Sequence, residues 1–171
     1  MPGMTDTASP GAGNGQDAEK LQEQVIAFIR SFGLLRPEST PCGQPLSVSE
    51  AHALLELSRL HGCSQTELGK ILQLEKSTVS RLVNQLKLKG WVERDRDPDD
   101  GRAVRLRLTA QGQRVAGQVA AARAAHFARV VEGIPPAERD AVIAAFQTVV
   151  KALESNDQSP GDESRDGRLQ T

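Results

Sequence analysis

Short polar side chains gather on one face of the helix that residues 76–89 are predicted to form. Apolar residues recur there at i, i+3, i+4 and i+7, so they share one stripe that should face a core: Val79, Leu82, Val83 and Leu86. The opposite face carries hydroxyls, amides and one guanidinium: Ser77, Thr78, Ser80, Arg81, Asn84 and Gln85. Such groups can form hydrogen bonds with base edges and phosphates without bringing bulk into a DNA groove. An ordinary amphipathic helix with a solvated polar face would show the same pattern.

A charged hairpin is predicted directly after this helix. Gly90 suits the helix C-terminus, and Trp91 and Val92 begin a strand. The turn DPDDG must be a loop. The second strand alternates three apolar residues with two arginines: Val104, Leu106 and Leu108 with Arg105 and Arg107. Residues 75–107 hold nine basic and six acidic side chains, a net charge of +3, and the arginines of the hairpin are placed to follow phosphates.

A shorter helix precedes residues 76–89 and completes the unit. Ser64 and Glu67 form a capping box, which predicts a helix over residues 64–72. Two helices with a tight connection and a basic β-ribbon predict a winged helix-turn-helix, which places its second helix in a major groove.

Three segments resemble the MarR family of bacterial transcription regulators: STVSRLVNQLKLKGWVER, DPDDGRAVRLRLTAQG and GIPPAERDAVIAAF. The family's wing pattern, Asp-x-Arg followed by a strand and Leu-Thr-x-x-Gly, is matched by Asp100, Arg102, Leu108, Thr109 and Gly112. The resemblance covers roughly residues 20–154. It implies that Arg102 enters the minor groove beside the site read by the helix, and that Asp100 orients it.

The fold class expected is mainly α with a small β-wing, a winged helix-turn-helix with dimerisation helices at both ends. Residues 1–17 and 155–171 are polar, and we expect disordered tails there. A MarR-like domain spans residues 18–154, with a DNA-binding lobe at 64–109. A second capping box, Ser47 to Glu50, opens a helix that should end near His61. Thr109 should cap a long helix to about Glu132, in which Gly112 and Gly117 cost local stability.

Dimerisation is expected through residues 18–35 and 109–154. The first of these segments and the last helix are more apolar than a small winged helix needs, and in the family the matching elements intertwine. A two-fold homodimer also suits the reading of double-stranded DNA, because two copies read half-sites about one helical turn apart. A monomeric core completed by the same helices is the alternative.

Composition narrows the class of protein. The chain has 171 residues, 38% hydrophobic and 25% charged, with a formal net charge of −1, so any affinity for nucleic acid must come from a local basic patch. No run of apolar residues is long enough for a membrane span and no signal peptide is evident, so a cytoplasmic protein is expected. The phosphate-loop, zinc-protease, nucleophile-elbow and Cys-x-x-Cys motifs are absent. We expect no enzyme and no cofactor.

The two cysteines, Cys42 and Cys63, make no disulfide framework. Cys63 precedes a helix N-terminus, which can lower a thiol pKa and create an oxidant sensor, although an unreactive structural cysteine is favoured. A metal site from His52, Glu56, His61 and Cys63 is disfavoured, because the last two lie at or beyond the helix end.

The function expected is a sequence-specific DNA-binding regulator, a homodimeric repressor on a pseudo-palindromic operator that a small ligand releases. DNA contacts are predicted for the polar helix face and the wing: Ser77, Thr78, Ser80, Arg81, Asn84, Asp100, Arg102 and Arg105. The family resemblance implies a small anionic or aromatic effector between the lobe and the dimerisation helices, with Phe28, Phe32, His52 and Arg114 as candidate contacts. The alternatives are a redox-sensing repressor acting through Cys63 and a winged-helix module that binds protein.

Overall fold

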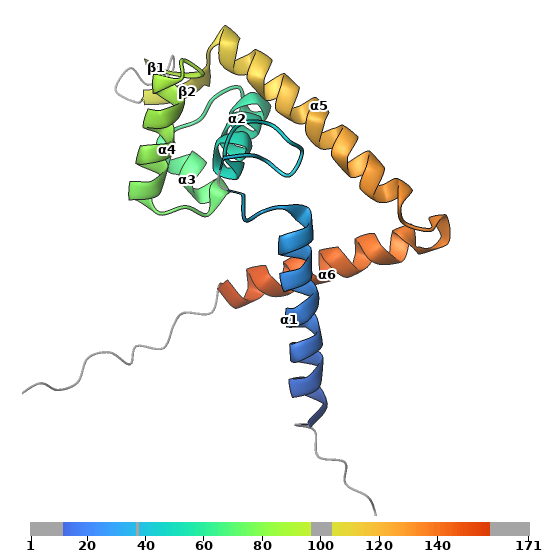
Figure 1. Cartoon of the computed structure of the whole chain (residues 1–171). Coiled ribbons are helices and arrows are strands. Elements are labelled where there is room, and N and C mark those ends of the chain that lie inside the picture. The colour runs from blue at the N-terminus through green and yellow to red at the C-terminus, as the bar shows by residue number, and fades with distance from the viewer. Residues whose placement is uncertain (1–11, 37, 97–103, 158–171) are drawn as a thin grey trace, which may run out of the picture. The chain divides into compact units, whose positions relative to one another are not determined.

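The computed structural model describes residues 12–36, 38–96 and 104–157. The elements follow the chain as α1 (Ala12–Phe32), α2 (Val48–Leu60), α3 (Gln65–Leu72), α4 (Lys76–Leu88), β1 (Val92–Arg96), β2 (Val104–Leu108), α5 (Ala110–Glu132), the 3-10 turn η1 (Pro136–Glu138) and α6 (Arg139–Asp157) (Figure 1). The predicted fold class, mainly α with a two-stranded wing, is confirmed. The chain divides into two compact units, residues 1–126 and 127–171.

Both predicted capping boxes are present. The Ser47 hydroxyl accepts from the Glu50 backbone N–H while the Glu50 carboxylate accepts from the Ser47 N–H, and Ser64 and Glu67 repeat this arrangement at α3. Each box satisfies two backbone donors that a helix start leaves open. At the other end of α2, His61 adopts a left-handed conformation and stops the helix where the sequence predicted.

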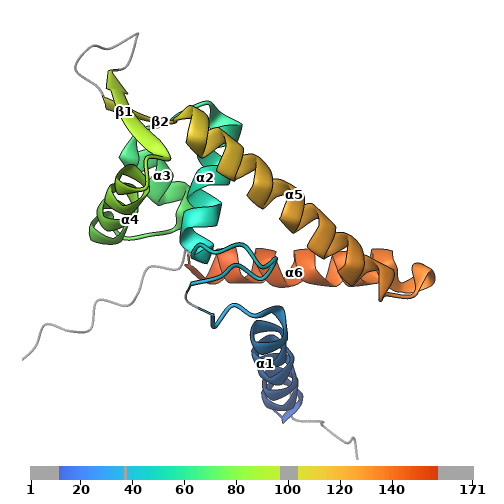
Figure 2. The ribbon, with the colours of Figure 1, turned by 45° about the horizontal axis from the view of Figure 1, so that its top comes forward.

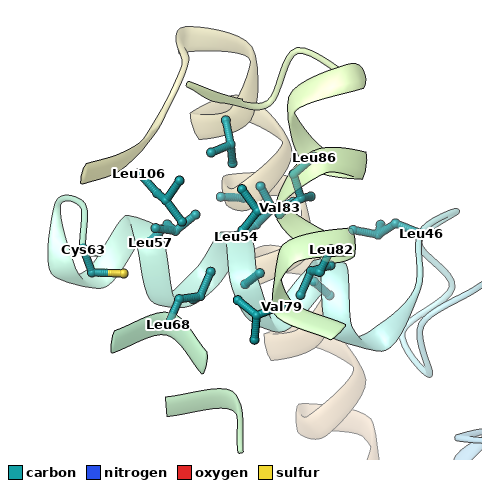
Figure 3. Packing of buried hydrophobic residues seen from close by; sticks show 14 of the residues in the cluster. Leu46, Leu54, Leu57, Cys63, Leu68, Val79, Leu82, Val83, Leu86 and Leu106 are labelled. Carbon is teal, nitrogen blue, oxygen red and sulfur yellow. The ribbon is translucent and has the colours of Figure 1, made fainter. Parts of the chain in front are cut away.

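The core of the first unit joins α2, α3, α4, the wing and the first half of α5. Its members are apolar residues from all of these elements, including Leu54, Leu57, Leu68, Val83, Leu86 and Leu106 (Figure 3). Ala116 and Val119 of α5 belong to the same cluster. The core of the DNA-binding lobe therefore includes segments outside residues 64–109. Helix α2 and the start of α5 cover apolar surface of α3, α4 and the wing that these short elements would otherwise expose.

The wing is an antiparallel pair in which Val92 faces Leu108 and Arg96 faces Val104. A third segment widens the sheet, since Cys63 exchanges two backbone hydrogen bonds with Leu106, at 3.2 and 2.8 Å. Figure 2 shows the hairpin beside α2, α3 and α4. Of the three alternating apolar residues predicted to be half-buried, Leu106 is buried in the core, Leu108 is partly buried and Val104 is exposed. Within the described strands, Val92 and Leu106 reach the core and Val104 does not.

The bounds of two helices differ from those predicted from the sequence. Helix α1 begins at Ala12, so residues 12–17 are helical and not part of a disordered tail, and it ends at Phe32. Helix α6 extends to Asp157, three residues beyond the predicted end at 154. Apolar periodicity marks only the part of a helix that has a buried stripe. A helix can continue into polar sequence, because each added residue gains a backbone hydrogen bond. The remaining predicted tail residues, 1–11 and 158–171, lie outside the described residues.

Candidate nucleic-acid interface

Helix α4 buries the predicted stripe and exposes the predicted polar face. Val79, Leu82, Val83 and Leu86 are the buried residues of α4. On the other side, Ser77, Arg81 and Asn84 are exposed, and Thr78 and Ser80 are partly buried. Arg81 stays close to its own helix, with Nε 3.5 Å from the Ser77 carbonyl oxygen. The fold thus presents short hydrogen-bonding groups and a guanidinium on the face of α4 that the core does not use.

Two arginines of the wing strands, Arg94 and Arg105, form hydrogen bonds with the protein itself. Arg105 Nη2 donates to the Gly62 carbonyl oxygen at 3.1 Å, and Arg105 is partly buried. Arg94 Nη2 donates to Gln65 Oε1 of α3 at 3.1 Å. Arg107 is also partly buried. Arg105 thus has a structural contact at the base of the wing, and its contact with DNA stays a prediction. Asp100 and Arg102, the candidates at the wing tip, lie outside the described residues.

Lys89 has a structural role that the sequence pattern of the helix did not reveal. Its Nζ donates to Glu50 Oε1 at 2.6 Å and lies 4.8 Å from the centroid of the Trp91 ring. The contact ties the end of α4 to the start of α2, 39 residues away in the chain. Helical periodicity places Lys89 on α4 but gives no sign of a partner so distant. The only signal in the sequence was that Glu50 belongs to a capping box, and its burial is known from the structure alone.

The charge state of Glu50 follows from these contacts. Burial by itself would raise the pKa of the carboxyl group, but the hydrogen bonds from Lys89 and Ser47 and the charge of Lys89 outweigh it, so the pKa of Glu50 is lowered from its ordinary value of 4.5. A carboxyl group with a lowered pKa contributes stability above its unfolded pKa. That stability is lost as the pH falls through the folded pKa.

The Glu50→Gln variant should therefore lose stability at neutral pH. The amide keeps an oxygen for the Ser47 N–H but leaves Lys89 without its anionic partner, and we expect a loss of about 1–2 kcal/mol. Urea unfolding at several pH values measures it. The difference from the wild type should shrink as the pH falls below 4.5. Glu56→Gln is the matched control, because Glu56 pairs with exposed Arg59 on the same helix and should change stability by less than about 1 kcal/mol. Equal losses in both variants, or a loss at Glu50 that does not vary with pH, would contradict the assignment.

Cys63 is placed as a structural residue. Its side chain is 3% exposed within the core. Burial raises the pKa of the thiol, Glu67 acts in the same direction, and the opposing charge of Arg105 does not compensate. The lowered pKa considered for an oxidant sensor is therefore wrong, because the surrounding core disfavours the thiolate more than the nearby helix start favours it. Cys42 lies partly buried in the loop before α2, with its sulfur 3.0 Å from Thr40 Oγ1.

The four candidate effector contacts occupy different surroundings. Phe28 and Phe32 stack on α1 with ring centroids 5.1 Å apart, and Phe32 meets the edge of the His126 ring at 5.3 Å. His52 and Arg114 are exposed on α2 and α5. Among residues 12–36, 38–96 and 104–157, no group of three or more His, Cys, Asp or Glu side chains is arranged to hold a metal ion. Over the same ranges, no helix is both long enough and apolar enough to cross a membrane.

The junction between the wing and α5 explains the Leu-Thr-x-x-Gly pattern. Thr109 Oγ1 donates to the Gly90 carbonyl oxygen at 2.7 Å and accepts from the Gly112 N–H at 3.0 Å, which caps α5 as predicted. Gly112 packs directly on the Trp91 backbone, where a Cβ would overlap the carbonyl oxygen and lie 2.8 Å from the carbonyl carbon. From the sequence, Gly112 matched the family's wing pattern, and its predicted effect on the helix was a cost in stability. The structure shows that it permits close contact between α5 and the wing.

Known proteins resemble this arrangement in sequence and fold. Residues 44–103 match the sequence model described as the MarR family. The HTH-type transcriptional regulator BilQ of Clostridioides difficile is 27% identical over 110 residues, which are 60% of this chain and 72% of that protein. Such relatives are named as transcriptional regulators, which fits the expectation that the chain is not an enzyme.

Solved structures share the fold. Streptococcus pneumoniae FabT, solved in complex with DNA, superposes with a TM-score of 0.70 at 21% identity, covering 81% of this chain and 98% of FabT. PcaV of Streptomyces coelicolor, solved with its natural ligand, gives a TM-score of 0.57 at 22% identity, covering 87% and 99%. The matched segment is thus similar in sequence to the MarR family of transcription regulators, and the winged-helix lobe shares its fold with FabT and PcaV.

Proposed function

We propose that the chain is a sequence-specific DNA-binding repressor that acts as a homodimer on a pseudo-palindromic operator. The observation that carries the proposal is the polar face of α4, which lies opposite the buried stripe and beside a basic hairpin. FabT, which shares this fold, was solved on DNA. Ser77, Thr78, Ser80, Arg81 and Asn84 are the proposed contacts in the major groove, with Arg102 and Asp100 at the wing.

Two exposed apolar helix faces support the homodimer. Helix α1 exposes Leu21, Val25, Ile26 and Phe28, and α6 exposes Ile143, Phe146, Val150 and Leu153. A helix with an exposed apolar stripe buries it when it packs on another chain. In this proposal α1, α6 and the later part of α5 form the dimer, which spaces two copies of α4 about 34 Å apart.

A small ligand is proposed to release the operator. PcaV was solved with its natural ligand. A ligand acts only through its different affinities for the DNA-competent and DNA-incompetent forms, and a coupling of about 1–3 kcal/mol would lower operator affinity roughly five- to 150-fold. Release by oxidation of Cys63 is not retained, since the thiol is buried and its pKa is raised.

Fluorescence anisotropy with the protein's own promoter DNA at two salt concentrations tests the proposal. A DNA-binding regulator should bind this fragment more tightly than a scrambled duplex of the same length, and affinity should fall as salt rises, because phosphate contacts release counterions. Equal affinity for the two duplexes would refute sequence-specific binding. No binding at low salt would favour a winged-helix module that contacts protein.

The Arg81→Ala variant should weaken binding to the promoter about tenfold or more, because a bidentate contact to a base edge contributes about 1–3 kcal/mol of discrimination. Its base preference should also relax at one position in each half-site. Lys87→Ala is the matched control, since Lys87 is exposed on the same helix and should lower affinity for all sequences alike and reduce the salt slope. An Arg81→Ala protein with unchanged affinity and footprint would remove Arg81 from the proposed contacts.

A further inference from the structure

Arg94 lies at the middle of β1, the wing strand that directly follows α4. Its cross-strand partner is Leu106, and partners in an antiparallel pair project on the same face of the sheet. Leu106 is buried in the core, so Arg94 also leaves the sheet on this inner face. Val92, two residues earlier on the same face, is buried as well, whereas Arg94 is exposed. Arg94 is therefore a cation on the inner face of the wing, at the point where this face emerges from the core.

A side chain of α3 holds the Arg94 guanidinium in place. Arg94 Nη2 donates to Gln65 Oε1 at 3.1 Å, across 29 residues of chain, and Gln65 is the first residue of α3. Gln65 is neutral, so the contact fixes the direction of Arg94 without compensating its charge. Among the ion pairs of the described part of the chain, none joins Arg94 to a carboxylate. A guanidinium has five N–H donors, and the bond to Gln65 uses one of them.

The outer face of the wing has a different distribution of charge. Glu93 stands across from Arg107, and Asp95 stands across from Arg105, so acidic and basic side chains face each other in both pairs. On the inner face, the residue across from Arg94 is the apolar Leu106. Of the two faces, the inner one thus presents a cation that has no acidic partner across the strand pair.

DNA bound as proposed above would bring phosphates to this inner face. With α4 in the major groove and the wing in the neighbouring minor groove, one sugar–phosphate strand separates the two grooves. That strand must pass between α4 and the far end of the wing. Strand β1 runs from the end of α4 toward that far end, beside α3 and α4 (Figure 2). A guanidinium on the inner face of β1 would meet these phosphates, and arginine can bind a phosphate through two parallel N–H groups.

We propose that Arg94 and Gln65 form a phosphate clamp on the DNA strand that separates the two grooves. Arg94 donates to a phosphate, and Gln65 is a positioning residue that orients the guanidinium before DNA is bound. A long side chain loses rotamer freedom when it is immobilised in a complex, and part of that loss has already occurred in the free protein. The clamp contacts the backbone, so it sets the register of the lobe on DNA and adds no base preference. It rests on the proposed DNA-binding function.

Fluorescence anisotropy of the full chain, on the promoter duplex and on a scrambled duplex of the same length, tests the clamp. Arg94→Gln should weaken binding to both duplexes by the same factor, about tenfold or more, because each protomer loses a hydrogen bond to a charged group. The slope of log affinity against log salt should become shallower by about 0.9 for each phosphate contact removed. Arg59→Gln is the matched control, since Arg59 is exposed and paired with Glu56 on α2. It removes the same charge and should change affinity by less than about twofold, because a charge without a phosphate contact releases no counterion.

Neutral methylphosphonate groups, placed one at a time along the strand between the grooves, locate the contact. At one position in each half-site this change should weaken binding of the wild type about fivefold or more. It should leave binding of Arg94→Gln unchanged, because the contact is already absent. Gln65→Glu is a second variant that retains Arg94 but gives it an acidic partner, and it should also lose the methylphosphonate effect.

The role of Gln65 is tested by a double-mutant cycle. Gln65→Ala should weaken binding of the wild type about two- to tenfold, as expected when an immobilised side chain is released. In the Arg94→Gln background it should have no effect, because there is no guanidinium left to orient. A residue that only supported the start of α3 would give equal losses in both backgrounds. Thermal melting verifies that each variant is folded.

Unchanged affinity of a folded Arg94→Gln protein overturns the clamp, and so do methylphosphonate losses that persist in this variant at every position. Equal losses from Gln65→Ala in both backgrounds overturn the positioning role. These outcomes leave the DNA-binding function intact, because the wild type still binds. A wild type that binds the promoter and the scrambled duplex equally refutes the sequence-specific regulator, and the clamp is then measured on either duplex. A wild type that binds neither duplex at low salt refutes both.

Discussion

Gly112→Ala should destabilise the protein by about 3 kcal/mol or more, although alanine is the better helix former by about 1 kcal/mol. The new methyl group would overlap the Trp91 carbonyl oxygen and lie 2.8 Å from its carbon. Both atoms belong to the backbone between α4 and β1, and Trp91 is held there by its N–H bond to the Leu86 carbonyl and by the Thr109 N–H. The clash therefore cannot be relieved by rotating a side chain, and α5 must move away from the wing.

Gly117→Ala is the matched control for this prediction. Gly117 lies on the same helix and has no atom within 4 Å of an added Cβ, so the variant should gain up to about 1 kcal/mol from helix propensity alone. Denaturant unfolding followed by circular dichroism measures both changes. If the two variants were equally stable, the close packing of α5 on Trp91 would be wrong. We also expect the Gly112 variant, where it still folds, to lose promoter affinity, because the wing is joined to α5 at this point.

Replacing two apolar residues of α6 by glutamate should abolish both the homodimer and tight operator binding. Phe146 and Leu153 are 51% and 64% exposed and lie seven residues apart, so they share one face of the helix. In the proposed dimer each substitution places an unpaired charge in an apolar interface, in both copies, at a cost of several kcal/mol. A monomer engages one half-site at a time, so affinity for the full operator should fall at least 100-fold.

Thr148→Glu with Ser155→Glu is the control, because these exposed residues are also seven apart and lie on the opposite face of α6. This double variant adds the same charge at the same spacing and should leave the homodimer and the affinity for the operator unchanged. Sedimentation velocity measures the oligomeric state and anisotropy the affinity for promoter DNA, while circular dichroism verifies that α6 is still helical. A Phe146→Glu, Leu153→Glu protein that sediments as a dimer would show that α6 lies outside the interface.

Local patterns predicted the helices of the lobe closely. A capping box is closed within four residues, and an apolar stripe repeats every turn, so Ser47, Ser64 and the stripe of α4 were correct from sequence alone. The end of α2 at His61 and the cap of α5 by Thr109 were also predicted. The start of α1 was wrong by six residues, because no apolar periodicity marks the helix from Ala12 to Asp17.

Contacts between residues far apart in the chain were not predictable from the sequence. The partner of Lys89 is Glu50, 39 residues earlier in the chain, and no local pattern links the two. From the sequence, Arg105 and Arg107 belonged to a basic β-ribbon. In the structure, the bridge between Cys63 and Leu106 places both arginine side chains next to Gly62. Charge in a sequence shows that a side chain can bind an anion, and only its neighbours in space decide whether the anion is DNA, a ligand or the protein's own glutamate.

What the sequence determined by itself was therefore the type and order of the elements and the polar face of α4, since these depend on spacing within one or two turns. The tertiary structure alone decided that Gly112 must be a glycine, that Cys63 is a core residue with a raised pKa, and that Arg107 lies against Gly62. Each of these depends on burial and on distances to atoms of other elements. Neither quantity exists until α2, the wing and α5 have packed together.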